Sequence, residues 1–257
     1  MSGPERGWVR VLGLGPGPER WLTEEASAVL DAAEHVVGYH TYLERLPPRP
    51  GQIRHGSDNG DELSRARHAL ELALGGARVA VVSGGDPGVF GMAAAVCEAL
   101  DAAGPSARAL DVAVLPGVTA MLAAAARLGA PLGNDFCAIN LSDNLKPWAV
   151  VERRLELAAR ADFVIALYNP ASRARPGQVH AAFELLRRHR APETVIVFAT
   201  AVGRPDEALH VTRLADADPG QADMRTLLLI GASSTRLVER PAGPPWIYTP
   251  RFVLEAP

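Results

Sequence analysis

The fold is decided by residues 78–88, RVAVVSGGDPG. Its first residues are apolar and mostly β-branched, which predicts a buried strand, and the glycines that follow predict a tight turn. The same pattern occurs twice more. The apolar run 8–12 leads into GLGPG at 13–17, and the run 112–115 leads into PGVTA at 116–120. Ligands bind beyond the carboxyl ends of parallel strands, so these turns predict a binding edge.

Segments rich in Ala, Leu, Glu and Arg alternate with strands in the first half of the chain. Thr23 is the expected N-cap of the first helix, because acidic residues follow it directly. The irregular composition of residues 38–60 predicts a long loop after a short strand at 36–37. The β-α rhythm predicts a mostly parallel sheet with helices on its faces. The expected helices of this half span 23–33, 61–74, 89–102 and 118–128.

The second half has a different order of predicted elements, because its last three strand candidates follow each other without a long helix between them. That order favours a mixed sheet. We therefore expect an α/β fold of two domains, 8–117 with a mostly parallel sheet and 118–252 with a mixed sheet, divided near Gly117. The expected strands of this half are 136–141, 163–168, 195–199, 208–213 and 226–230, and its helices are 148–160 and 178–189.

The composition is that of an ordinary globular protein, with 48% hydrophobic and 21% charged residues among 257. A net charge of −3 does not favour a nucleic-acid or membrane partner. Cys97 and Cys137 lie among apolar residues and are expected to be buried thiols, which with the lack of an apolar leader segment predicts a cytoplasmic protein. No CxxC or HxxxH pair is present, so no metal site is expected.

The turns favour a cationic ligand over a phosphate. GLGPG departs from the dinucleotide fingerprint, and Pro16 and Pro18 remove two backbone donors that a phosphate would use. Gly84 and Gly85 form a shelf without side chains. Asp86 has two interpretations: it caps a helix that starts at Pro87, or its carboxylate meets a cation. The sulfonium and ammonium groups of S-adenosylmethionine suit the second interpretation.

Longer segments extend the pattern along nearly the whole chain, from residue 11 to residue 251. This chain resembles the tetrapyrrole methylases, the S-adenosylmethionine-dependent enzymes of corrin and siroheme biosynthesis. The resemblance implies a cofactor cleft between two α/β domains, and usually a homodimer. The segments that carry it are GLGPG, VVGYHTYLERL, SGGDPGVFGMA, PGVTAMLAAAARLGAPLGNDFCAINLSDNLKPW, ADFVIALYNPASRARPGQ, AVGRPDE, DMRTLLLIGASSTR and IYTPR.

Four shorter segments, GVFGMA, LSDNLKPW, ALYNPASRARP and YTPR, resemble the ring-contracting member of the family. This implies methylation of precorrin-3B at carbon 17 with ring contraction to precorrin-4, in cobalamin biosynthesis. Neighbouring pathway enzymes would then hand over the substrate. Three alternatives stay open: the anaerobic-route enzyme acting on cobalt-precorrin-3, a nicotinamide-dependent dehydrogenase, and a non-catalytic ligand-binding module.

The resemblance also assigns roles to positions of this sequence. Leu227 belongs to the segment 226–228, which together with 231–233 is expected to close around the adenosine. The full set of implied cofactor residues is Pro16, Gly84, Gly85, Asp86, Val89, Thr119, Ala120, Tyr168 and Leu227.

Asp143 and Lys146 are the candidates for a general acid or base in the ring-contraction step, with Glu207 as a weaker one. The structural alternatives are a capping role for Asp143 before Pro147 and a solvated surface position for Lys146. Precorrins carry acetate and propionate groups, so arginines are expected to bind the substrate through bidentate contacts. The candidates are Arg173 and Arg175, with Arg204 and Arg251 as further options.

Tyr39, His40 and Tyr42 form an aromatic cluster for which two roles compete, an anchor onto the second domain and a lid near the substrate. Two positions depart from the family pattern. Asn134 stands where a histidine is expected and Asn140 where a serine is expected, which puts in doubt an acid–base role at position 134.

Overall fold

The computed structural model describes residues 7–58, 60–171 and 177–252. The chain divides into two compact units, Met1–Thr119 and Ala120–Pro257. Gly117, where the domain boundary is predicted, lies in the loop that ends unit 1. Over the described ranges, no helix combines the length and the apolar character needed to cross a membrane.

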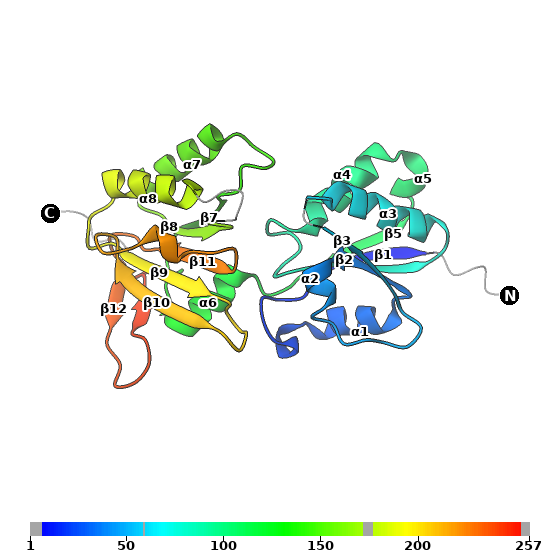
Figure 1. Ribbon diagram of the computed structural model, residues 1–257, viewed down its shortest axis with the longest axis horizontal. Coiled ribbons are helices and arrows are strands. Elements are labelled where there is room, and N and C mark those ends of the chain that lie inside the picture. Colours follow the sequence, from blue (N-terminus) through cyan, green and yellow to red (C-terminus); the bar gives the residue numbers. More distant parts are fainter. Residues whose placement is uncertain (1–6, 59, 172–176, 253–257) are drawn as a thin grey trace. The chain divides into compact units, whose positions relative to one another are not determined.

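Unit 1 is a parallel sheet of five strands in the order β3-β2-β4-β1-β5, with helices on both faces (Figure 1). Side chains of β4 alternate between two cores: Val79 and Val81 pack with α3 and α4, while Ala80 and Val82 pack with α1. The elements are β1 (Trp8–Gly13), η1 (Glu19–Trp21), α1 (Glu24–Ala32), β2 (His35–Tyr39), α2 (His40–Leu43), β3 (Ile53–Ser57), α3 (Glu62–Leu74), β4 (Arg78–Ser83), α4 (Met92–Ala102), α5 (Pro105–Arg108) and β5 (Asp111–Leu115).

Unit 2 is a mixed sheet in the order β10-β9-β11-β8-β7, accompanied by a small sheet β12-β13-β6. Helices α7 and α8 pack on one face around Phe183 and Leu155, and α6 lies against β11 on the other (Figure 1). The elements are α6 (Ala120–Leu128), β6 (Gly129–Ala130), β7 (Phe136–Asn140), α7 (Trp148–Arg160), β8 (Val164–Tyr168), α8 (Gly177–His189), β9 (Val195–Thr200), β10 (Ala208–Arg213), η2 (Pro219–Gln221), β11 (Thr226–Ile230), β12 (Arg236–Val238) and β13 (Trp246–Tyr248).

The α/β fold class is confirmed, with a parallel sheet in the first unit and a mixed one in the second. In unit 2, β7 and β8 run parallel, whereas β8, β11, β9 and β10 pair antiparallel. The expected helices and strands are present with small shifts at their ends. Thr23 is the N-cap of α1, since its hydroxyl accepts a hydrogen bond from the N–H of Ala26 at 3.2 Å.

The prediction of one long loop over 38–60 is wrong, because α2 and β3 lie within it. Strand β3, with the sequence IRHGS, is at the edge of the sheet and buries little, so it lacks the apolar signal of a strand. The short helix α5 was also not expected, because four residues carry too little periodicity.

The expectation of two buried thiols is also wrong. Cys97 is exposed and Cys137 is only partly buried, and both are free thiols. Helix α4 turns Met92, Val96 and Ala99 toward the core, which leaves Cys97 on the opposite side. Burial still raises the pKa of the Cys137 thiol, although the charge of Arg190 acts in the other direction.

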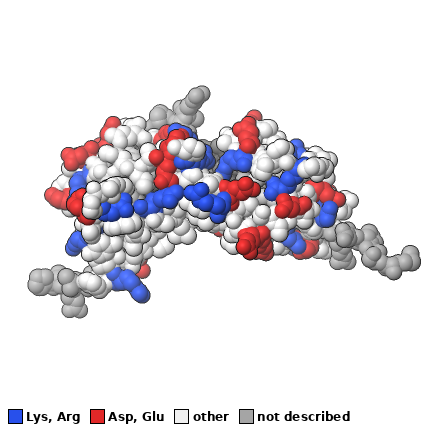
Figure 2. Space-filling model, turned by 90° about the horizontal axis from the view of Figure 1, so that it is seen from below, with Lys and Arg blue, Asp and Glu red and all other residues white. Residues whose placement is uncertain are grey.

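Charges of both signs are interspersed on the face of the molecule shown in Figure 2, among many uncharged residues. This mixture agrees with the small net charge of −3.

Candidate functional site

The three glycine-containing turns lie at one edge of the sheet of unit 1. Strands β4, β1 and β5 are neighbours, and their register pairs Gly13 with Ser83 and Leu12 with Leu115. The turns at 13–17, 83–88 and 116–120 therefore start at the same level. This edge contains Pro16, Gly84, Gly85, Asp86, Val89 and Thr119 from the predicted cofactor set.

Two of these turns are joined by a pair of backbone hydrogen bonds. The N–H of Gly15 donates to the carbonyl of Gly85 at 3.1 Å, and the N–H of Gly85 donates to the carbonyl of Gly15 at 3.1 Å. Both residues have left-handed backbones, with φ of 64° and 66°. Glycine adopts this region at little steric cost, so the backbone conformation of the turns favours glycine at both positions.

Close backbone packing explains two further glycines at the same edge. A Cβ atom at Gly13 would lie 2.3 Å from the carbonyl oxygen of Gly85, and one at Gly117 would lie 2.4 Å from the same oxygen. Any side chain at either position would collide with backbone. The edge of unit 1 is therefore assembled from main-chain atoms of three loops.

Asp86 links two of the turns through its carboxylate. Its Oδ1 accepts a hydrogen bond from the N–H of Gly88 at 2.8 Å, and its Oδ2 accepts one from the N–H of Gly117 at 2.9 Å. The prediction that Asp86 caps a helix starting at Pro87 is wrong, because α4 starts at Met92 with Gly91 as its N-cap. The acceptor sites left on each oxygen keep the carboxylate able to meet a cation.

Arg45 holds the first turn, and sequence reasoning missed it. Its Nη2 donates to the carbonyls of Leu14 at 3.3 Å, Gly15 at 2.9 Å and Gly17 at 3.0 Å. A charged donor shared by three carbonyls fixes the path of a loop that contains two prolines and can form few hydrogen bonds of its own. The sequence separation of about 30 residues left no local signal for this contact.

The aromatic cluster belongs to unit 1. Tyr42 lies against Gly84, where an added Cβ would be 2.7 Å from the ring, and it packs on the core of that unit. Tyr39 meets Tyr42 edge to face, with 5.4 Å between ring centroids. Within unit 1, Tyr42 supports the shelf formed by Gly84, and the two roles of the cluster, an anchor onto the second domain and a lid near the substrate, stay predictions.

Unit 2 brings together its own members of the predicted cofactor set. The hydroxyl of Tyr168, at the end of β8, accepts a hydrogen bond from the N–H of Met121 at 3.0 Å, next to Ala120 at the start of α6. Leu228 packs with α7 and α8, so its neighbour Leu227, which is buried, faces the other side of the sheet. Ala120, Tyr168 and Leu227 are thus associated with the side of the sheet that α6 covers.

The candidate acid and base lie in the loop between β7 and α7. The Oδ2 of Asp143 accepts a hydrogen bond from Nε2 of Gln178 at 3.0 Å, so a contact with α8 orients this carboxylate. Burial lowers the pKa of the Lys146 ammonium, the nearby charge of Arg154 lowers it further, and Asp143 partly offsets both effects. Lys146 is partly buried, contrary to the alternative of a solvated surface lysine.

The carboxylate of Glu207 is held in place by contacts within unit 2. Its carboxylate pairs with the guanidinium of Arg127 at 3.1 Å and accepts a hydrogen bond from the N–H of Gly203. Arg251 is exposed. The predicted substrate residues Arg173 and Arg175 lie outside the described residues.

The two departures from the family pattern both take part in turns. Asn134 accepts a hydrogen bond from the N–H of Asp135 at 2.7 Å. Asn140, at the end of β7, accepts hydrogen bonds from the N–H of Ser142 at 2.8 Å and from Nδ2 of Asn169 at 3.1 Å. Asn140 therefore connects the loops that follow β7 and β8.

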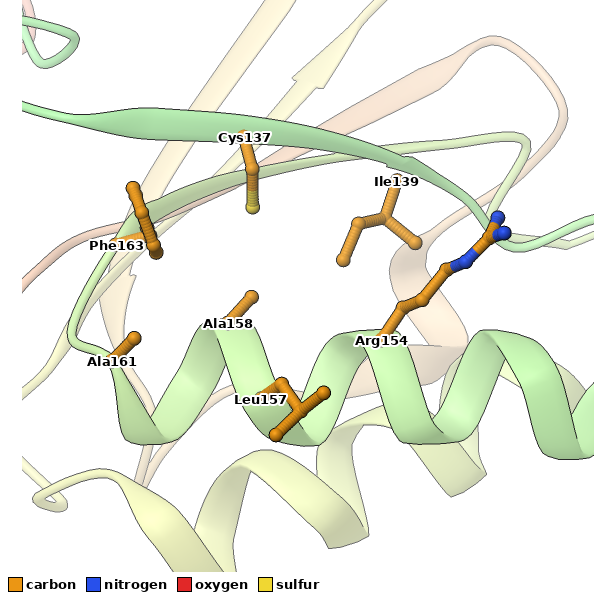
Figure 3. A pocket seen from close by; sticks show the side chains of 7 residues that line it. All are labelled: Cys137, Ile139, Arg154, Leu157, Ala158, Ala161 and Phe163. Atoms are coloured by element: carbon orange, nitrogen blue, oxygen red, sulfur yellow. The ribbon is translucent and has the colours of Figure 1, made fainter.

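A separate apolar pocket of about 430 Å³ lies between β7 and α7 (Figure 3). Arg154 stands at one end of it, and the other lining residues are Cys137, Ile139, Leu157, Ala158, Ala161 and Phe163. This lining includes no residue of the predicted cofactor set. The pocket is therefore distinct from the edge of unit 1 and from the predicted cofactor residues of unit 2.

Among the described residues, no group of three or more His, Cys, Asp or Glu side chains is placed to hold a metal ion. Three histidines do form a chain in unit 1. Nδ1 of His35 lies 2.8 Å from Nε2 of His55, and Nδ1 of His55 lies 3.0 Å from Nε2 of His68. Burial, and then the charges of His68 and His35, lower the pKa of the His55 imidazole.

The turns and the two-unit α/β architecture define a class of proteins. Residues 9–218 match the family described as Tetrapyrrole (Corrin/Porphyrin) Methylases, and the chain belongs to this family. It is 55% identical to the precorrin-3B C(17)-methyltransferase of a Sinorhizobium species, over 96% of this chain and 97% of that protein. It is also 43% identical to a probable cobalt-factor III C(17)-methyltransferase of Salmonella typhimurium, over 88% of this chain and 93% of that protein.

Solved structures agree with this assignment. The crystal structure of the methyltransferase CobJ matches with a TM-score of 0.89 and 54% identity, covering 95% of this chain and 100% of that one. A uroporphyrin-III C-methyltransferase from Thermus thermophilus, complexed with S-adenosylhomocysteine, matches with a TM-score of 0.65 and 26% identity, covering 88% and 92%. Membership of a methylase family excludes the expected alternative of a nicotinamide-dependent dehydrogenase.

Proposed function

We propose that this protein transfers a methyl group from S-adenosylmethionine to carbon 17 of precorrin-3B, with contraction of the ring to precorrin-4. The observation that carries the proposal is the 55% identity to a precorrin-3B C(17)-methyltransferase over 96% of the chain. An identity of this size that extends over both units supports the same substrate as well as the same fold.

The edge of unit 1 has the chemistry that a cationic cofactor needs. Its three turns expose backbone atoms and the carboxylate of Asp86, and their sequences at 13–17, 83–88 and 116–120 contain no Lys or Arg. A pyrophosphate would require open N–H donors or basic side chains instead. Asp86 would attract the positive groups of the cofactor, and Pro16, Gly84, Gly85, Val89 and Thr119 would line it.

We further propose Ala120, Tyr168 and Leu227, all in unit 2, as cofactor-binding residues. Tyr168 would hold the start of α6 in place through the N–H of Met121. Leu227, from the α6 side of the sheet, would offer an apolar contact to the adenosine. Weaker S-adenosylhomocysteine binding in variants of these three residues would support this assignment, and unchanged binding would contradict it.

Little acid–base chemistry is needed for methyl transfer itself. S-adenosylmethionine supplies a methyl group that is already activated on a sulfonium. The proposed cofactor residues of both units therefore act by orienting the reactants, which contributes about 7–11 kcal/mol in favourable cases. Ring contraction also requires proton transfer. We assign this to Lys146, whose ammonium gives up a proton more readily than usual, and to Asp143, oriented by Gln178.

The deciding experiment uses the full chain, labelled S-adenosylmethionine and two substrates offered separately, precorrin-3B and cobalt-factor III. Label transfer to precorrin-3B, with the mass and absorption spectrum of a ring-contracted product, supports the proposal. Transfer only to the cobalt-containing ring would assign the protein to the anaerobic route. S-adenosylhomocysteine binding without transfer to either ring would favour a non-catalytic ligand-binding module.

We further propose a cytoplasmic homodimer that receives its substrate from neighbouring cobalamin-pathway enzymes. Precorrins are unstable, so a direct handover would protect them from solvent. Sedimentation of the pure protein tests the dimer, and a monomer at micromolar concentration contradicts it. Competition by an inactive variant of a neighbouring enzyme in a coupled assay tests the handover.

A further inference from the structure

Phe90 has an unusual backbone for its residue type. Its φ is 54°, in the left-handed region, and 49% of its surface is exposed. It follows the SGGDPG turn and precedes α4, so it lies at the carboxyl edge of the sheet of unit 1. A bulky residue in this region costs free energy.

Hydrogen bonds on both sides of Phe90 maintain this conformation. Before it, Asp86 ties the turn to Gly88 and Gly117. After it, the N–H of Ala93 donates to the carbonyl of Pro87 at 2.9 Å, and a Cβ at Gly91 would lie 2.6 Å from Oγ of Ser83. The surrounding turn therefore dictates the backbone of Phe90.

Three other described non-glycine residues have a left-handed backbone, namely Asp162, Asn169 and Ala201. Asp162 follows the C-cap residue of α7, and its carboxylate accepts hydrogen bonds from Ser233 and Arg190. The side chain of Asn169 donates to Asn140, and Ala201 is buried. Of these four residues, Phe90 alone presents a large apolar side chain that is half exposed.

We propose that Phe90 is a substrate-binding residue whose ring stacks on a pyrrole ring of the tetrapyrrole. This inference rests on the proposed function, because it names a contact to that substrate. The carboxylates of the substrate lie around its rim, which leaves the faces of its rings apolar. Phe90 stands beside the predicted cofactor residues Asp86 and Val89 on the same loop, so a ring held there lies next to the methyl donor. Aromatic rings in offset contact attract each other beyond the effect of buried area.

The test compares Phe90→Gly and Phe90→Tyr with the wild-type full chain. Glycine accepts the left-handed backbone freely, so Phe90→Gly should melt at the same or a higher temperature. It should bind S-adenosylhomocysteine as the wild type does and raise the KM for precorrin-3B about tenfold, which corresponds to about 1.4 kcal/mol. Phe90→Tyr, which keeps the ring, should restore a KM close to that of the wild type.

Leu74→Ala is the matched control. Leu74 is also half exposed and apolar, but it ends α3 shortly before β4 begins, which places it toward the amino edge of the sheet. This variant should leave KM unchanged. An unchanged KM in Phe90→Gly, or a lower melting temperature with no change in KM, would overturn the inference in favour of a packing role.

A second probe separates this inference from the proposed function. Uroporphyrin, a stable polycarboxylate tetrapyrrole, is titrated into each variant and followed by absorption. Weaker uroporphyrin binding in Phe90→Gly supports the stacking role even where no methyl transfer is detected. Equal uroporphyrin binding by wild type and Phe90→Gly would overturn it even where methyl transfer is active.

Discussion

The carboxyl edge of unit 1 and the corresponding region of unit 2 are built by different means. In unit 1, backbone atoms of Gly13, Gly15, Gly85 and Gly117 pack against one another directly. In unit 2, side chains make the connections, as Tyr168 does to the start of α6. A main-chain edge tolerates almost no added atom, whereas a side-chain edge can lose one contact and relax. The two units should therefore differ sharply in their sensitivity to substitution.

The largest effect is expected for Gly13→Ala. The new Cβ would meet the carbonyl oxygen of Gly85 at 2.3 Å, so the turns must separate. We expect a loss of about 1–3 kcal/mol in the free energy of unfolding. Displacement of the cofactor residues should lower kcat/KM about 100-fold. Gly177→Ala is the control, since a Cβ there meets nothing within 4 Å, and equal effects of both variants would refute the comparison.

Asp86→Ala tests the one side chain on which the edge of unit 1 depends. Loss of two acceptors should cost about 1–3 kcal/mol of stability, because the N–H groups of Gly88 and Gly117 lose their partner. S-adenosylhomocysteine should bind about tenfold more weakly, as titration calorimetry would measure. Asp86→Asn keeps an acceptor without the charge. If it binds as the wild type does, the carboxylate charge has no role in cofactor binding.

Arg173→Ala combined with Arg175→Ala sharpens the comparison by separating substrate from cofactor. We expect the KM for precorrin-3B to rise about fivefold, the size of one exposed ion pair. The affinity for S-adenosylhomocysteine should stay unchanged. A parallel loss of both affinities would show that these arginines do not bind the substrate specifically.

Tyr168→Phe is expected to have a smaller effect than either substitution in unit 1. It removes the acceptor for the N–H of Met121 and should cost about 1 kcal/mol. S-adenosylhomocysteine affinity should fall about threefold, since the ring itself remains. A loss as large as that of Asp86→Ala would mean that the edge of unit 2 is no more tolerant than that of unit 1.

The smallest effect concerns the histidine chain, a side-chain cluster inside unit 1. The pKa of His55 is lowered in the folded state, so the unfolded state binds more protons. The free energy of unfolding should therefore decrease as the pH falls below about 6.5, the ordinary value for histidine. His55→Gln should flatten this slope in denaturant titrations at several pH values. An unchanged slope would assign the pH dependence to other groups.

The main elements of both units could be predicted because their periodicity is local. Helix α7 and strand β11 begin and end at the predicted residues, since apolar spacing and flanking turns mark both ends. Strand β3 could not be predicted, because an exposed edge strand is specified by its partner β2 and by little in its own sequence. Helix α2 is too short to show a period.

The candidate site was predictable to a similar degree. Glycine-rich turns can be recognised in the sequence, and the order of the strands in the sheet then places these turns together. The partners of Asp86 and the role of Arg45 were not predictable, because both depend on loops that meet only after folding. The sequence suggests a cap for Asp86, since Asp before Pro is typical of a helix start, but α4 starts only at Met92, and the Asp86 carboxylate binds the N–H groups of Gly88 and Gly117.

The sequence by itself determined which residues form most of the strands, where glycine-containing turns follow them and that these turns carry no Lys or Arg. Each of these properties depends on neighbours along the chain. The tertiary structure alone decided that the carbonyl of Gly85 sits where side chains at positions 13 and 117 would lie, and that Arg45 holds the first turn. These contacts join residues far apart in sequence, and they exist only once parallel strands have brought their carboxyl ends to a common edge.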